Sequence, residues 1–381
     1  MNEIRLKETP LKECIQFIEA NKKEFSDKDS AMKSGEDEKN YEVKRDRFFE
    51  IPRIENERKI GFVDGGTAPL IISADFSISL NRVAGILQEH NRFLSPKKIP
   101  LYIEFYSATI LRLNEEKKLE FITRLFPREE EYQEFLPEER FLRFSPYDIT
   151  IQERRGFLPR IENLGAIAMR FSEWTYGSKF IENELTENDI FVRDGSLQTG
   201  YTGEIELADK LYSNGLQNGV YITGLSKTCR IPTKKGDSLI SLVNSMGSKE
   251  YPDQAWYYHP IKKVTRADNK ADLFFVKLHK DSLYPFRFDI FIEQTKDFEK
   301  EGKDEEKALI SSLASCSDDL SFIGYPYGLI KVDQLARIPN RDLESQKVQL
   351  LSEFNKDTYE SYILPRIRSM NAHDLLNKIR K

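Results

Sequence analysis

Short apolar runs with interspersed polar positions mark the chain between residues 59 and 113. Residues 59–64 read KIGFVD, an apolar run that closes on a carboxylate. Residues 70–80 and 99–113 are rich in Ile, Phe, Tyr and Ser and alternate in part between apolar and polar positions, which is typical of strands. The pattern therefore predicts three strands in this region.

The hydrophobic period becomes helical after residue 160. Apolar side chains recur on one face of a predicted helix over 161–182, which we expect to pack against a sheet. Farther along, the pattern predicts strands at 189–194, 219–225, 273–279 and 287–292, and helices at 204–214, 238–246 and 308–315. Strands and helices in this order predict an α/β protein built around a mixed sheet.

Changes in charge and periodicity suggest three regions. Residues 1–50 are strongly charged, with apolar positions at helical spacing, and are interpreted as a helical N-terminal segment. Residues 51–340 form the main domain, in which 114–158 are interpreted as an irregular charged insertion. Residues 341–381 are predicted to form a C-terminal helical basic tail.

Composition narrows the class of protein. The 381 residues are 39% hydrophobic and 32% charged, with a mean hydropathy of −0.56, as in soluble globular proteins. No apolar run approaches the roughly 20 residues of a membrane-spanning helix, and the N-terminus lacks the apolar stretch of a secretory signal. The three cysteines are scattered, which excludes a disulfide scaffold. We therefore expect a cytoplasmic protein with no membrane association.

Charge and histidine content limit the kinds of nucleic-acid surface and metal site that the chain can form. The net charge of −5 argues against a basic coat for nucleic acid, but it is compatible with a nuclease that has a locally positive groove. The four histidines form no HxxxH or HExxH pattern, so a histidine-based zinc hydrolase is not expected. Any metal chemistry in this chain must therefore depend on carboxylates.

Three carboxylates stand out as candidates for chemistry. Asp64 and Asp194 each precede a glycine at the end of a predicted strand, where active sites of open α/β sheets gather, although Asp-Gly is also a common turn signal. Glu173 lies near the apolar face of the 161–182 helix, where it either pairs with Arg170 or faces the two aspartates. Three converging carboxylates would require Mg²⁺ or Mn²⁺, and two such ions suit in-line hydrolysis of a phosphodiester.

Five short motifs in order over roughly residues 55–340 resemble the NurA nucleases. They are Asp64-Gly-Gly-Thr, Arg170 with Glu173, Asp194-Gly-Ser-Leu, Gly224-Leu-Ser-Lys227, and Gly324-Tyr-Pro-Tyr followed by Asp333. The resemblance implies an RNase H-like core of mixed sheet flanked by helices. It also implies a dimeric, manganese-dependent DNA nuclease that works with the hexameric translocase HerA in DNA end processing, repair or phage defence.

The resemblance also assigns roles to residues. Asp64, Glu173 and Asp194 would be metal ligands for Mn²⁺ or Mg²⁺, with two ions expected, and Lys227 would lie near the scissile phosphate, where an ammonium stabilises developing charge. The fourth ligand position of the family is usually histidine, and here the matching residue is Asp333. Aspartate is a good ligand for a hard metal, but it does not shuttle protons near neutral pH.

Two other functions remain open. The sequence Asp64-Gly-Gly-Thr also resembles the first phosphate loop of sugar kinases and actin-like ATPases, but the later motifs do not match the remaining loops of those enzymes. The chain could also be a catalytically weak RNase H-like subunit that docks on a translocase through its N-terminal helix. Retention of Asp64, Glu173 and Asp194 favours the enzyme.

Several further residues allow both a functional and a structural interpretation. Arg287 and the basic residues of 366–381 are candidates for phosphate contacts, and Lys227 could be an ordinary surface lysine. Core packing is favoured over base stacking for a set of four aromatic side chains, which are Trp174, Trp256, Tyr257 and Tyr258. Cys229 is expected to be a buried thiol.

Overall fold

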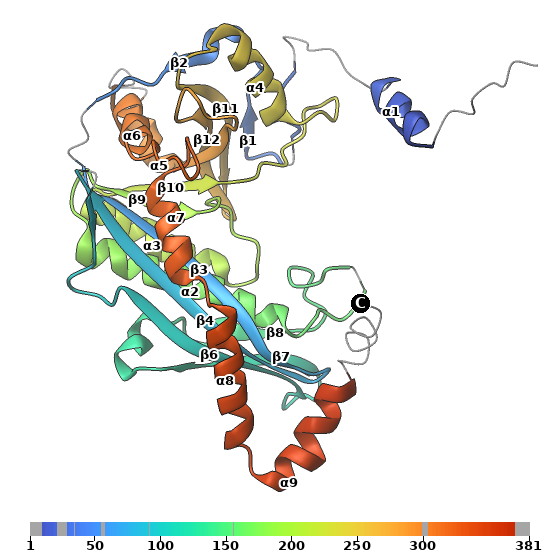
Figure 1. The fold of residues 1–381 in the computed structure, drawn as a ribbon. Coiled ribbons are helices and arrows are strands. Elements are labelled where there is room, and N and C mark those ends of the chain that lie inside the picture. The colour runs from blue at the N-terminus through green and yellow to red at the C-terminus, as the bar shows by residue number, and fades with distance from the viewer. Residues whose placement is uncertain are drawn as a thin grey trace, which may run out of the picture.

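The fold is organised around one large mixed sheet. The computed structural model describes residues 10–20, 29–33, 35–54, 58–90, 92–154, 156–298 and 304–369. Within this part of the chain, thirteen strands join in the sheet, and helices lie on both of its faces (Figure 1). The predicted α/β class, with a mixed sheet flanked by helices, is thereby confirmed.

An antiparallel meander forms one half of the sheet. Four strands pair in chain order: β3 (Ile60–Ile72), β4 (Phe76–Glu89), β6 (Tyr102–Leu113) and β7 (Leu119–Pro127). Two short strands extend it, with β5 (Arg92–Leu94) on β4 and β8 (Arg143–Phe144) on β7. These pairings place β3 next to the centre of the sheet.

Two parallel strands continue the sheet from β3. β9 (Ile190–Asp194) pairs with β3, and β10 (Tyr221–Ser226) pairs with β9. The connections run through helices α2 (Asn163–Glu184) and α3 (Glu204–Asn218). The first three strands of the meander, β3, β4 and β6, together with the two parallel strands beside β3, have the RNase H-like arrangement, so that part of the fold prediction is confirmed.

The far half of the sheet is antiparallel and comes mostly from later parts of the chain. Its strands, in spatial order from β10, are β13 (Phe286–Phe291), β12 (Asn269–Lys277), β11 (Trp256–Arg266) and β1 (Glu38–Asn40), with β2 (Phe48–Glu50) also on β11. Helix α4 (Leu239–Glu250) packs on this half, where Val243 and Trp256 share a core.

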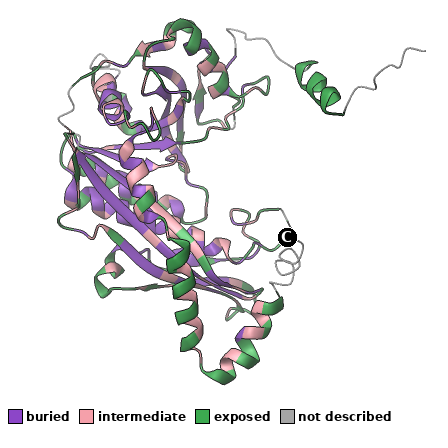
Figure 2. Cartoon of the chain, viewed as in Figure 1, coloured by how far each residue is buried: buried purple, intermediate pink, exposed green. Residues whose placement is uncertain are grey.

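Two main cores cover the two faces of the sheet, which appears as a continuous band of buried residues in Figure 2. Side chains of α2 and α3 pack on one face, as Phe171 and Leu211 do against Phe191. On the other face, α6 (Asp304–Ala314) and α7 (Tyr327–Ala336) pack against Phe62 and its neighbours. The two cores fix α2 and α7 on opposite sides of β3.

Peripheral helices complete the described chain. They are α1 (Pro10–Ala20), α5 (Ile292–Phe298), α8 (Asn340–Glu353), α9 (Lys356–Thr358) and a π-helical turn at Tyr359–Ile363. In the part of the chain that the structure describes, every helix is too short or too polar to cross a bilayer. The end of the predicted basic tail, residues 370–381, lies outside the described residues.

Several predicted boundaries are wrong. The strand predicted to end at Asp64 continues to Ile72, because β3 pairs with β4 over its whole length. The predicted strand 70–80 contains the hairpin turn between β3 and β4. The region 114–158 is not irregular throughout, since β7 pairs with β6 and short 3₁₀ turns follow it. Only part of 1–50 is helical, because β1 and β2 join β11. The division into three regions stays a prediction.

Candidate active site

Asp64 and Asp194 lie next to each other because their strands are parallel and in register. The register of β3 and β9 ends with the pair Val63 and Arg193, and each aspartate is the next residue on its own strand. Side chains alternate between the faces of a strand, and the two aspartates therefore point to the face that carries Phe62. The register thus places the two carboxylates side by side at the point where β9 ends.

The two glycines after Asp64 let helices approach β3 from both faces. A Cβ on Gly65 would lie 2.2 Å from Met169 Sδ and 2.8 Å from Glu173 Oε1, both of α2. A Cβ on Gly66 would lie 2.3 Å from the carbonyl oxygen of Ala336, at the end of α7. The Gly-Gly step is therefore no turn; it is the place where both helices contact the strand.

Helix α7 brings a third aspartate to the pair. Asp64, Asp194 and Asp333 each offer an oxygen, and these three oxygens lie within 4.8 Å of one another. Residues far apart in the sequence are thus joined by the packing of α7 on the sheet. The structure brings together three of the residues that sequence analysis singled out as metal ligands.

Lys227 and Tyr325 border this aspartate cluster. The Lys227 ammonium lies 2.7 Å from Asp194 Oδ2 and 3.7 Å from Asp333 Oδ1, and its side chain is 47% exposed. The Tyr325 hydroxyl lies 3.4 Å from Asp194 Oδ1. Asp333 also accepts a hydrogen bond from Arg337 at 2.9 Å. Lys227 is therefore not an isolated surface lysine, because it neutralises part of the cluster's charge.

Glu173 is close to the cluster but is bound to another partner. Arg193 Nη2 donates to Glu173 Oε2 at 2.6 Å, and both side chains are buried. Arg193 also lies over the ring of Trp174. Arg170, which the sequence offered as the partner of Glu173, pairs with Glu204 instead. The alternative in which Glu173 pairs with Arg170 is thus wrong, and the role of Glu173 as a metal ligand stays a prediction.

Burial and crowding of negative charge shift the pKa values of the site. Burial, followed by the charges of Glu173 and Asp194, raises the pKa of Asp64 to about 8, against the opposing effects of the Gly65 N–H and Lys227. The pKa of Lys227 is raised above its usual value. Burial alone would lower this pKa, but the hydrogen bond to Asp194 and the nearby carboxylates have the larger effect. The site favours a bound cation over a set of free carboxylates.

The residues of the cluster fit a hard divalent cation. Carboxylate oxygens are the ligands that Mg²⁺ and Mn²⁺ prefer, and Asp64, Asp194 and Asp333 supply them from three elements. Burial, followed by the nearby charges of Glu173 and Asp194, raises the pKa of Asp64, and a bound cation would offset both effects. Lys227 supplies one positive charge to the cluster.

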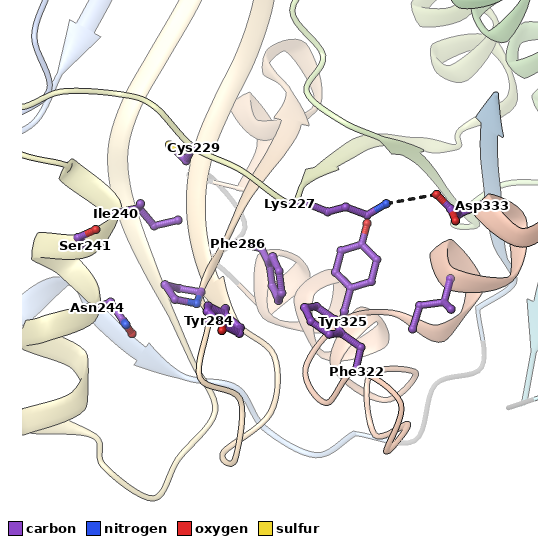
Figure 3. A pocket seen from close by; sticks show the side chains of 12 residues that line it. Lys227, Cys229, Ile240, Ser241, Asn244, Tyr284, Phe286, Phe322, Tyr325 and Asp333 are labelled. Atoms are coloured by element: carbon purple, nitrogen blue, oxygen red, sulfur yellow. Dashed lines mark ion pairs between the residues drawn. The ribbon is translucent and has the colours of Figure 1, made fainter. Parts of the chain in front are cut away.

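A pocket of about 630 Å³ opens beside the cluster (Figure 3). Lys227, Tyr325 and Asp333 line the pocket as well as bordering or forming the cluster. Most of its other walls are apolar, with Phe286 and Phe322 among them. Sequence analysis missed both this pocket and Arg193. The signal for Arg193 was its position directly before Asp194 in an otherwise apolar strand.

The remaining candidates have structural positions. The four aromatic residues considered for base stacking are fully buried, which confirms core packing for Trp174, Trp256, Tyr257 and Tyr258. Arg287 is largely buried and makes a double hydrogen bond to Asp289, so a direct DNA contact by Arg287 is not favoured. Cys229 is half-buried and lines the pocket. Of the basic tail, Arg366 pairs with Asp75.

Comparisons with known proteins show distant likenesses. No model of a known protein family matches the chain, and no curated protein matches its sequence significantly. Among solved structures, the chain is similar to the NurA nuclease from Sulfolobus solfataricus, with a TM-score of 0.46, 13% identity and coverage of 81% of this chain and 87% of NurA.

Two further solved structures are more distant. Endonuclease V of Ciona intestinalis, in complex with DNA containing an inosine, has a TM-score of 0.33 and 11% identity over 76% of this chain and 87% of its own. Argonaute of A. aeolicus has a TM-score of 0.30 and 9% identity over 75% of this chain and 30% of its own. Likenesses at this level do not assign the chain to a family, so the function must be argued from the geometry of the site.

Proposed function

We propose that the protein is a divalent-metal-dependent nuclease that hydrolyses phosphodiester bonds of DNA. The observation that carries the proposal is the convergence of Asp64, Asp194 and Asp333, each of which offers an oxygen within 4.8 Å of the others. Two of these residues come from parallel strands, and the third comes from helix α7, much later in the sequence. The cluster lies at the carboxyl end of β9, and the carboxyl ends of parallel strands are a preferred location for active sites of α/β sheets. The ions would be Mn²⁺ or Mg²⁺, with two expected.

The residues of the site then have separate tasks. Asp64, Asp194 and Asp333 would hold the cations, and bound cations would supply Lewis-acid activation of the phosphoryl group and of water. Lys227 reaches the cluster from a half-exposed position and stabilises negative charge that develops on the phosphate. Glu173, which the motif resemblance makes a further metal ligand, adds negative charge beside Asp64, and Arg193 fixes the orientation of the Glu173 side chain.

The finer assignment rests on the motif resemblance. The ordered motifs from Asp64 to Asp333 support a NurA-type enzyme that acts as a homodimer with a HerA-type hexameric translocase in DNA end processing, repair or phage defence. For the contact with the translocase we propose α1, which exposes Leu11 and Ile18 to solvent. Amphipathic helices of this kind bind grooves on partner proteins.

Cleavage of end-labelled DNA tests the nuclease. Purified protein is incubated with single-stranded and double-stranded DNA in Mn²⁺, Mg²⁺ or EDTA, beside Asp194→Asn and the exposed control Asp342→Asn. We expect cleavage that needs metal, is lost by at least 100-fold in Asp194→Asn, and is unchanged in Asp342→Asn. The size of the loss follows from removal of a charged metal ligand.

The same assay separates the alternatives. If wild-type protein is inactive both alone and with its translocase and ATP, the nuclease proposal is overturned and the docking subunit becomes the better explanation. The sugar-kinase alternative required a phosphate-binding turn at Asp64–Thr67. Those residues instead lie within β3 and pair with β4 through Thr67 and Asn81, so this turn is not formed.

A further inference from the structure

The pocket beside the aspartate cluster is built from four separate parts of the chain. One wall comes from α4, with Asn244, and another from the segment before β13, with Tyr284. Phe322 and Tyr325 come from the segment before α7, and Lys227 follows β10. In Figure 3 the labelled aromatic side chains line the space between α4 and the Lys227–Asp333 pair.

Aromatic rings form the pocket's main surface. Tyr284 and Phe322 stack with their planes 10° apart and their centroids separated by 6.3 Å. Phe322 also contacts Phe286 and Tyr325, at centroid distances of 6.2 Å and 5.7 Å. Tyr284 and Phe322 nevertheless remain 57% and 43% exposed, so two large rings present surface to the pocket and to solvent. Exposed aromatic surface of this kind marks a binding site for a planar group.

Polar groups stand at both ends of this aromatic surface. Lys227 and Asp333 belong to the aspartate-cluster end, and Asn244 and Ser241 of α4 lie on the other side of the pocket. An asparagine amide both donates and accepts hydrogen bonds, as the edge of a nucleobase requires. A ligand in the pocket would therefore have a planar, partly polar body and a phosphate directed toward the cluster.

We propose that this pocket binds an unpaired nucleobase of the substrate strand, next to the phosphodiester that is cleaved. The proposal rests on the nuclease function proposed above. The volume of about 630 Å³ suits a nucleoside. Lys227, Tyr325 and Asp333 belong both to the pocket wall and to the aspartate cluster or its border, so a phosphate attached to the bound nucleoside would lie at the metal site. A base inside a duplex is stacked on both faces, so only a single-stranded or displaced base fits this surface.

Binding can be measured without cleavage. Full-length protein is titrated in EDTA with a labelled single-stranded oligonucleotide that contains one 2-aminopurine, and both the anisotropy of the label and the 2-aminopurine fluorescence are followed. Stacking on a ring quenches 2-aminopurine. We expect quenching at one or two positions of the oligonucleotide and binding that is at least 5-fold weaker to a fully paired duplex.

Variants identify the rings. Phe322→Leu and Tyr284→Leu keep apolar volume but remove the ring, and we expect about 10-fold weaker binding and loss of quenching in each. Tyr284→Phe should keep both signals. Tyr147→Leu is the matched control, because Tyr147 is 72% exposed and does not line this pocket. Circular dichroism and melting temperature verify that each variant is folded.

The outcomes distinguish this proposal from the nuclease itself. Unchanged binding and quenching in folded Phe322→Leu and Tyr284→Leu would overturn the base pocket, even if the protein cleaves DNA with metal. Quenching that depends on both rings would support the pocket, even if no cleavage were found. Equal affinity for single strand and duplex, with no quenching at any position, would likewise overturn it and would favour another occupant for the aromatic surface.

Discussion

At the residue scale, the central feature is a carboxylate held where its charge is unfavourable. Asp64 has a pKa raised to about 8 by burial and by its acidic neighbours, whereas a free aspartate has a pKa near 3.8. Sequence analysis could select Asp64 and Asp194 from their positions after apolar runs. It could not predict that Glu173 pairs with Arg193 instead of Arg170, because that choice depends on which face of β9 meets α2.

Asp64 should make the metal-free protein less stable as the pH rises. Between pH 4 and 8 the folded state holds a proton that the unfolded state has lost, so this contribution is fully present below pH 3.8 and is lost as the pH rises through about 8. Asp64→Asn removes the ionisation. We expect it to match wild type at pH 4 and to exceed it at pH 8 by several kcal/mol in free energy of unfolding. Urea denaturation in EDTA measures this difference.

Asp75 provides a control, because its pKa is shifted in the direction opposite to that of Asp64. Burial acts to raise its pKa, but the Ser73 hydroxyl and Arg366 outweigh burial and lower it. Asp75→Asn should therefore destabilise the protein at pH 8, and its effect should shrink as the pH falls below 4. If Asp64→Asn also destabilised the protein at pH 8, the charge crowding inferred for the cluster would be refuted.

At the element scale, the sequence predicted most helices and strands but not their lengths. Asp64-Gly-Gly has the composition of a turn, and only the pairing of β3 with the distant part of β4 shows that the strand continues. β11 was missed because its Trp256–Tyr258 run is buried on both faces and is followed by lysines, so it lacks clean alternation. In both cases the local sequence pattern did not show the strand.

The contact between α7 and β3 should depend on Gly66. A Cβ at this position would lie 2.3 Å from a backbone carbonyl of α7, which cannot rotate away, so Gly66→Ala should displace the helix that carries Asp333. We expect a loss of about 2 kcal/mol in free energy of unfolding, as for other overpacked sites, and at least 10-fold slower cleavage. Gly200→Ala is the control, because nothing lies within 4 Å of its added Cβ. Equal behaviour of the two variants in melting and cleavage assays would contradict this account of the Gly-Gly step.

At the scale of the whole molecule, the aspartate cluster depends on the complete fold. Asp64 and Asp194 come from adjacent strands, whereas Asp333 arrives on a helix packed on the sheet's α6 and α7 face. The motif order along the chain could be recognised from the sequence, but the meeting of Asp333 with the two strands required the packing of α7. A cation bound by all three residues would therefore link distant segments, and it would stabilise the folded state but not the unfolded state.

This linkage predicts a pH-dependent thermal shift by Mn²⁺. Binding requires Asp64 to lose its proton, and its pKa of about 8 means that the proton is still held at pH 6, so Mn²⁺ should bind more weakly there. We expect 1 mM Mn²⁺ to raise the melting temperature by several degrees at pH 8 and by clearly less at pH 6. Asp333→Asn should lose most of the shift at pH 8, while Asp342→Asn should keep it, since Asp342 is an exposed residue of α8. A shift of equal size in Asp333→Asn would place the bound ion elsewhere, and the cleavage chemistry would then have to be sought away from the end of β9.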